Sequence, residues 1–142
     1  MTSVASGLSC AWLLSVALVD ARSRRIPWPL AAVGLLVAAG VAASTGTAWA
    51  AVAGGAALGA VYLVLRLISP SSLGGGDLKA APAMGALSAS AAGTDGWLVV
   101  LVVPFVITAL AGLVLRVARG ARAVPHGPGM CLAAAAVLLS SW

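Results

Sequence analysis

The chain of 142 residues alternates long apolar runs with short polar segments. Runs of this kind match the roughly 20 residues that a helix needs to cross the hydrocarbon core of a bilayer, within a range of about 17–25. The pattern predicts an all-α polytopic membrane protein, with residues 1–142 forming one membrane-embedded domain built as a bundle of six transmembrane helices. The expected spans are residues 4–19, 28–43, 48–68, 78–92, 97–117 and 129–142.

The composition supports a membrane protein with very short loops. Hydrophobic residues make up 62% of the chain and charged residues 8%, whereas an ordinary soluble domain is about 45–50% apolar and about 25% charged. Cys10 and Cys131 both lie in apolar runs, and neither belongs to a CxxC pair, so we expect no metal and no cofactor.

The basic residues predict the orientation of the chain in the membrane. With six spans, all eight Lys and Arg residues fall on the side of the first, third and fifth loops. Such loops are cytoplasmic under the positive-inside rule, which places both termini outside. The net charge of +5 therefore indicates contact with anionic lipid headgroups, and no nucleic-acid partner is expected.

Small and aromatic residues indicate how the helices pack. Gly55 and Gly59 form a small-xxx-small pair, which predicts close approach of a neighbouring helix. Four tryptophans lie near the expected membrane interfaces, where tryptophan is enriched: Trp28, Trp49, Trp97 and Trp142. Trp12 lies deeper and does not fit this belt.

Three aspartates are the only acidic residues, and the topology separates them. Asp20 ends the first span and Asp77 begins the fourth, so both are expected at the cytoplasmic face. Asp95 lies in an outer loop and is expected to be a turn residue. Structural roles are possible for the other two: Asp20 as an interfacial partner of Arg24 and Asp77 as a helix N-cap. Ionisable residues near the bilayer are costly, however, and mark function by default.

Two carboxyl groups held close together are suited to acid–base chemistry. They tend to share one proton, so that one can take a proton from water while the other donates to a carbonyl. The triplet of Gly74, Gly75 and Gly76 precedes Asp77. Glycine accepts positive φ, so the triplet is expected to turn the chain sharply into the fourth span and to leave room for an extended peptide beside Asp77.

Three motifs resemble those of the type IV prepilin peptidases, which are GxGD intramembrane aspartic proteases. Residues 74–77, GGGD, match GxGD, and Lys79 extends the match to GxGDxK. Residues 20–30, DARSRRIPWPL, are similar to a D-x-R-x-x-x-I-P-N stretch, and residues 125–129, PHGPG, are similar to P-F/Y-G-P. The positions expected to shape the site are Ile26, Pro27, Gly74, Gly75, Gly76, Lys79, Pro125, Gly127 and Pro128.

The resemblance implies an aspartic endopeptidase with Asp20 and Asp77 as its catalytic residues. Members of the family cut the basic leader from prepilins and pseudopilins at the cytoplasmic face of the bacterial plasma membrane. This chain lacks the CxxC pairs of the N-methyltransferase domain, so it resembles the short, peptidase-only forms found with Flp-type (tight adherence) pili.

Two residues depart from the family motifs. Trp28 stands where the family has Asn, and His126 stands where it has an aromatic residue, so His126 is expected at the rim of the site, with a proton partner as the other interpretation. The alternatives to a peptidase are an inactive relative and a non-catalytic membrane protein, such as a transporter subunit or a pilus-assembly component.

Overall fold

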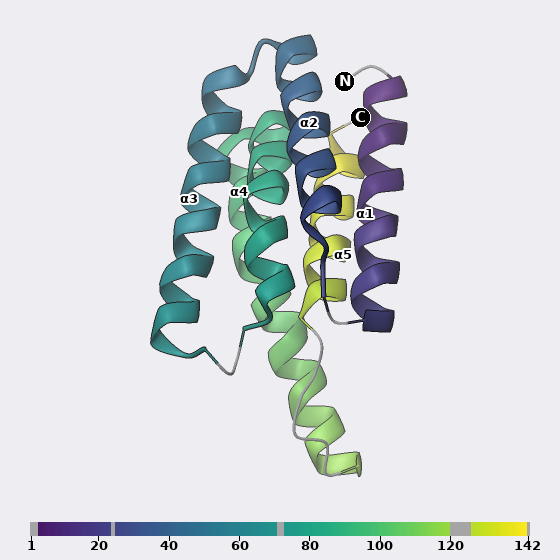
Figure 1. The fold of residues 1–142 in the computed structure, drawn as a ribbon, viewed down its shortest axis with the longest axis vertical. Coiled ribbons are helices and arrows are strands. Elements are labelled where there is room, and N and C mark those ends of the chain that lie inside the picture. Colours follow the sequence, from purple (N-terminus) through teal and green to yellow (C-terminus); the bar gives the residue numbers. More distant parts are fainter. Residues whose placement is uncertain (1–2, 24, 71–72, 120–125, 142) are drawn as a thin grey trace.

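The computed structural model describes residues 3–23, 25–70, 73–119 and 126–141, and its regular elements there are helices. Figure 1 shows them standing side by side as a bundle, with the start of α1 and the end of α5 at the same end. The helices are α1 (Ser3–Ser23), α2 (Trp28–Thr45), α3 (Ala48–Ile68), α4 (Gly75–Arg119) and α5 (Gly127–Ser140).

Four of these helices, α1 to α4, are long and apolar enough to cross a membrane, and α5 is a shorter apolar helix. The chain is therefore an all-helical membrane protein. The expected count of six separate helices is not confirmed, because the fourth and fifth predicted spans both lie within α4.

A backbone break divides α4 into two arms. Ala92 (φ −139°, ψ 23°) and Gly93 (φ 61°, ψ −144°) are non-helical, and the chain reverses direction there (Figure 1). Glycine adopts the positive φ without the clash that a Cβ would cause. The helix begins at Gly75 rather than at Leu78, so its first arm, residues 75–91, is about 26 Å long at 1.5 Å per residue. That length approaches the roughly 30 Å of the hydrocarbon core.

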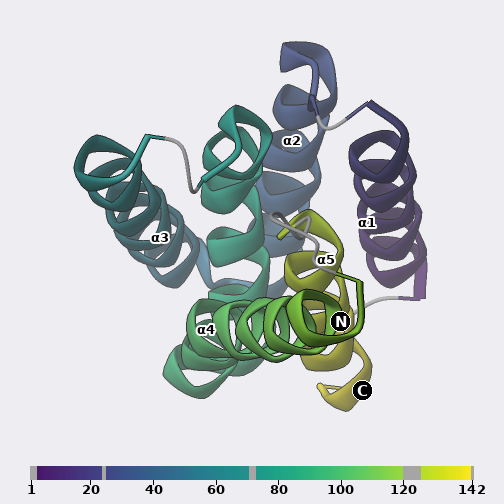
Figure 2. The same cartoon turned by 90° about the horizontal axis from the view of Figure 1, so that it is seen from below.

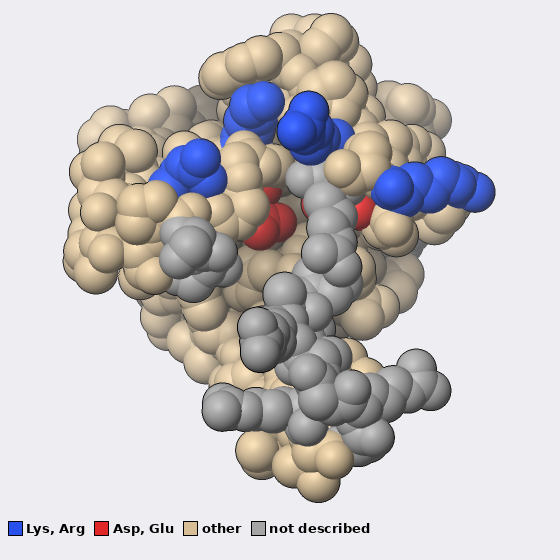
Figure 3. Space-filling model, turned by 60° about the horizontal axis from the view of Figure 1, so that its bottom comes forward, with Lys and Arg blue, Asp and Glu red and all other residues tan. Residues whose placement is uncertain are grey.

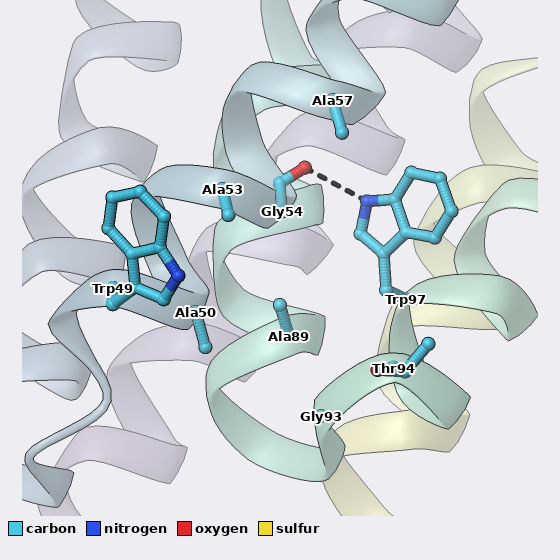
Figure 4. Close-up of a pocket in the computed structure, with 9 residues that line it drawn as sticks. All are labelled: Trp49, Ala50, Ala53, Gly54, Ala57, Ala89, Gly93, Thr94 and Trp97. Carbon is cyan, nitrogen blue, oxygen red and sulfur yellow. Dashed lines mark hydrogen bonds between the residues drawn. The ribbon is translucent and has the colours of Figure 1, made fainter.

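Glycines bring α3 and α4 into close contact, as the small-xxx-small pattern predicts. A Cβ on Gly55 would lie 2.8 Å from the Pro82 carbonyl oxygen, and one on Gly59 would lie 3.0 Å from the Pro82 ring. Further along the same interface, Trp97 Nε1 donates a hydrogen bond to the Gly54 carbonyl oxygen at 2.9 Å. Figure 4 shows this bond beside a hollow that lies between Trp97 and Trp49.

Further contacts hold α1 and α5 against the other helices of the bundle. Trp12 is buried on Gly34 of α2 and donates from Nε1 to the Leu30 carbonyl oxygen at 2.8 Å, which explains its position away from the interfacial belt. α5 packs between α1 and α4 (Figure 2). Packing α5 there brings its first turn against the end of α1 and the second arm of α4.

Candidate active site

Asp20 lies in the last turns of α1 and is only 6% exposed. Its carboxyl group packs against Gly127, the first residue of α5. A Cβ added to Gly127 would overlap Asp20 Oδ2 and would lie 2.7 Å from the carboxyl carbon. Only glycine fits at residue 127 with the Asp20 carboxyl group in its present position. The suggested pairing of Asp20 with Arg24 lies outside the described residues.

Asp77 is the third residue of α4 and is 5% exposed. Its carboxylate accepts a hydrogen bond from the backbone N–H of Gly74, just before the helix. The N-cap interpretation of Asp77 is therefore wrong, and the contact is the half of a capping box in which a side chain in the first turn bonds back to the chain before the helix. Among the described residues, Asp77 Oδ1 is buried and has no hydrogen-bond partner.

Gly76, directly before Asp77, serves close packing rather than a left-handed turn. Among the described residues, only Gly46 and Gly93 have positive φ, so the expectation of positive φ at residues 74–76 is wrong. A Cβ on Gly76 would lie 3.1 Å from the backbone nitrogen of Ile26. The start of α4 thus lies directly on the loop that follows α1.

Lys79 strengthens the same contact, which joins the GxGDxK motif to the stretch at residues 20–30. Its Nζ donates a hydrogen bond to the Ile26 carbonyl oxygen at 3.2 Å and lies 5.1 Å from the centre of the Trp28 ring. Pro27, which is extended (φ −70°, ψ 148°), leads directly into α2. Trp28, which departs from the family motif, therefore contacts the lysine of the GxGDxK motif.

These contacts bring the Asp20 and Asp77 carboxyl groups into electrostatic interaction with each other. The Cys131 thiol, on α5, interacts electrostatically with both. In Figure 3 the acidic residues lie recessed on the face where the described basic side chains gather. Asp95 lies far from this face, exposed just beyond the break in α4.

His126 is buried, so its expected position at the rim of the site is wrong. Its Nε2 shares a hydrogen bond with the Tyr62 hydroxyl at 2.8 Å, and its Nδ1 shares one with Thr108 Oγ1, also at 2.8 Å. The Phe105 ring packs on the imidazole, with 4.8 Å between ring centres. Burial lowers the pKa of His126 below its ordinary value of 6.5.

His126 and Gly127, both in the PHGPG motif, thereby connect the two aspartates. Gly127 touches the Asp20 carboxyl group, and the neighbouring His126 bonds to Tyr62, which interacts electrostatically with Asp77. Sequence reasoning missed Tyr62 and Thr108. Tyr62 could have been noticed as the only tyrosine in the chain, placed within an apolar run. Pro128 is the second residue of α5, and Pro125 lies outside the described residues.

In the part of the chain that the structure describes, no three His, Cys, Asp or Glu side chains are grouped as a metal site requires. The arrangement defines a helical membrane protein with a buried carboxyl pair near one end of its bundle. A family model described as the type IV leader peptidase family matches residues 7–117. The chain belongs to this family, which gives it a leader-peptidase-like function. No curated protein and no solved structure gives a significant match.

Proposed function

We propose that this chain is an aspartic endopeptidase that removes the basic leader from prepilins or pseudopilins. The observation that carries the proposal is the electrostatic interaction of two buried carboxyl groups from α1 and α4. They are 57 positions apart in the sequence, so their convergence requires the tertiary fold. Family membership supports the choice of peptide hydrolysis over the other uses of paired carboxyl groups.

The chemistry uses one proton shared by Asp20 and Asp77. The ionised carboxylate takes a proton from a water molecule, whose oxygen attacks the carbonyl carbon of the scissile peptide bond. The protonated partner donates to the carbonyl oxygen as the tetrahedral intermediate forms. The carbon–nitrogen bond then breaks, and a proton passes to the leaving amine. Asp77 Oδ1, unpartnered among the described residues, is the oxygen best suited to hold the water.

The remaining features of the proposal concern location and substrate. We place the active site at the cytoplasmic face of the bacterial plasma membrane, because the described basic side chains gather on the face where the acidic residues lie recessed (Figure 3). Arg22 and Arg25 are exposed there. They would repel a basic leader, so the carboxyl pair supplies the attraction, and the arginines contact lipid headgroups. The proposed systems are Flp-type pili and related secretion pilins.

The test is cleavage of a pilin precursor, with a basic leader and an apolar helix, by purified chain in proteoliposomes. Asp20→Asn and Asp77→Asn should each reduce the cleavage rate by at least about 100-fold, because each removes one partner of the acid–base pair. Asp95→Asn is the matched control and should cleave at the wild-type rate. Wild-type cleavage by either of the first two variants would refute the aspartic mechanism, and absence of cleavage in every variant and the wild type would favour a non-catalytic role.

A further inference from the structure

A lateral groove lies between α2, α3 and α4 on the outside of the bundle. It consists of two hollows, of about 370 and 410 Å³, that share Leu35 and Pro82 as lining residues. Ala32 and Ala39 line the wall formed by α2 and are exposed. The groove is therefore open to the surroundings of the helices, which in a membrane protein are lipid.

The length of the groove matches one leaflet of a bilayer. On α4 the lining residues run from Gly75 to Ala86, a rise of about 16 Å at 1.5 Å per residue. The hydrocarbon core is about 30 Å thick, so the groove extends from the end of the bundle to about its middle. A single acyl chain of a phospholipid spans this depth.

The charge in the groove is confined to its mouth. Arg66 and Lys79 are the charged lining residues, and both line the hollow at the end where α4 begins. Arg66 Nη1 donates to the Leu73 carbonyl oxygen at 2.8 Å, and Lys79 Nζ donates to the Ile26 carbonyl oxygen. Within the described residues, the hydrogen-bond partners of both side chains are neutral carbonyl groups, which do not compensate a positive charge, and a guanidinium has further donors to offer. The groove thus fits a molecule that is anionic at one end and apolar along the rest.

Asp77 faces away from this groove. Gly75, Lys79, Pro82 and Ala86 are spaced by four, three and four residues, so they share one face of α4. Asp77 lies two residues after Gly75, about 200° further around the helix. A peptide in the groove would be separated from Asp77 by the helix itself, and a basic leader would be repelled at the mouth. A lipid therefore fits the groove better than a substrate does.

We propose that an anionic phospholipid from the leaflet on the side of the basic loops binds in this groove. Its phosphate contacts Arg66 and Lys79, with the Trp28 ring beside the headgroup, and one acyl chain lies along the small residues between α2 and α3. The interaction does not depend on peptide hydrolysis. The bound lipid would hold the GxGDxK motif and the stretch at residues 20–30 together, because Lys79 already bonds to Ile26.

Native mass spectrometry of the purified full-length chain in detergent tests the proposal. Phosphatidylglycerol is titrated against phosphatidylcholine with the same acyl chains, and glycerol phosphate serves as a headgroup without a chain. Phosphatidylglycerol should bind at least about tenfold more tightly than phosphatidylcholine. The double variant Arg66→Gln with Lys79→Gln should bind it about 30-fold more weakly than the wild type does. The double variant Arg22→Gln with Arg25→Gln, which removes the same charge from headgroup contacts outside the groove, should weaken binding far less.

A second variant tests the groove without touching its charges. Ala56, exposed on α3, lines the apolar half, and Ala56→Trp should block the acyl chain and weaken the binding of phosphatidylglycerol. Equal binding of the two lipids would overturn the proposal, and so would full binding by Ala56→Trp. Tight binding of glycerol phosphate alone, or displacement of the lipid by a pilin precursor, would also overturn it, by assigning the groove to a free phosphate or to the substrate.

Discussion

Replacing Gly127 by alanine tests whether the position of the Asp20 carboxyl group matters for cleavage. The new Cβ would overlap Asp20 Oδ2 and lie 2.7 Å from the carboxyl carbon, whereas ordinary contact begins at 3.4 Å. The carboxyl group must therefore retreat by at least about 0.7 Å. A misplacement of about 1 Å in an active site costs up to about 100-fold in rate, so we expect Gly127→Ala to lose between one and two orders of magnitude in cleavage.

The same helix supplies a matched control. A Cβ on Gly129 would have the Pro104 carbonyl oxygen as its nearest neighbour, at 3.5 Å, which is ordinary contact. Both variants gain helix propensity, by up to about 1 kcal/mol, so neither should unfold for that reason. The measurement is the initial rate of precursor cleavage in proteoliposomes, compared at equal amounts of folded protein. Gly127→Ala activity equal to that of Gly129→Ala would refute the claim that the Asp20 carboxyl group takes part in the reaction.

Three further changes should affect stability in predictable directions. Tyr62→Phe leaves a buried ring nitrogen of His126 without its partner and should lower the free energy of unfolding by about 1–3 kcal/mol in a denaturant titration; an unchanged value would contradict the bond. Because burial lowers the folded-state pKa of His126, the unfolded chain binds a proton that the folded chain excludes as pH falls below 6.5. Wild-type stability should therefore fall in that range, and more steeply than that of His126→Phe. The same dependence of melting temperature on pH in both proteins would exclude this contribution of His126. Gly85→Ala would push a Cβ into the Gly54 carbonyl oxygen and should cost about 1–3 kcal/mol, whereas Gly40→Ala, with no atom within 4 Å of its Cβ, should cost nothing; equal unfolding midpoints would refute the close contact of α3 and α4.

Much of the fold follows from the sequence because membrane spans require long apolar runs. The runs at 28–43 and 48–68 correspond to α2 and α3 with small changes at their ends. The separation of Asp20 and Asp77 from Asp95 followed from counting spans. The break in α4 lies where the run at 78–92 was expected to end, but only Ala92 and Gly93 leave the helix and Thr94 resumes it, whereas the segment GTDG suggested a longer turn.

The buried partners in the site depend on tertiary contacts that leave little trace in the sequence. His126 is the only histidine, and nothing in its neighbourhood predicts that Tyr62 and Thr108, on two other helices, bond to its ring. The role of Gly76 was likewise misread, because a glycine needed for close packing against Ile26 looks the same in sequence as one needed for a turn. Family membership identifies which motifs matter, and the structure shows how they touch.

The proposed mechanism requires the two carboxyl groups to be neighbours, and cross-linking measures this directly. In a chain with Cys10 and Cys131 replaced by serine, Asp20→Cys is combined with Asp77→Cys, and a short bifunctional thiol reagent is added to native membranes. We predict a single intramolecular bridge, detected by intact mass, and no bridge when Asp20→Cys is combined with Asp95→Cys. Bridging of the second pair but not the first would place the carboxyl groups apart and contradict the proposed catalytic pair.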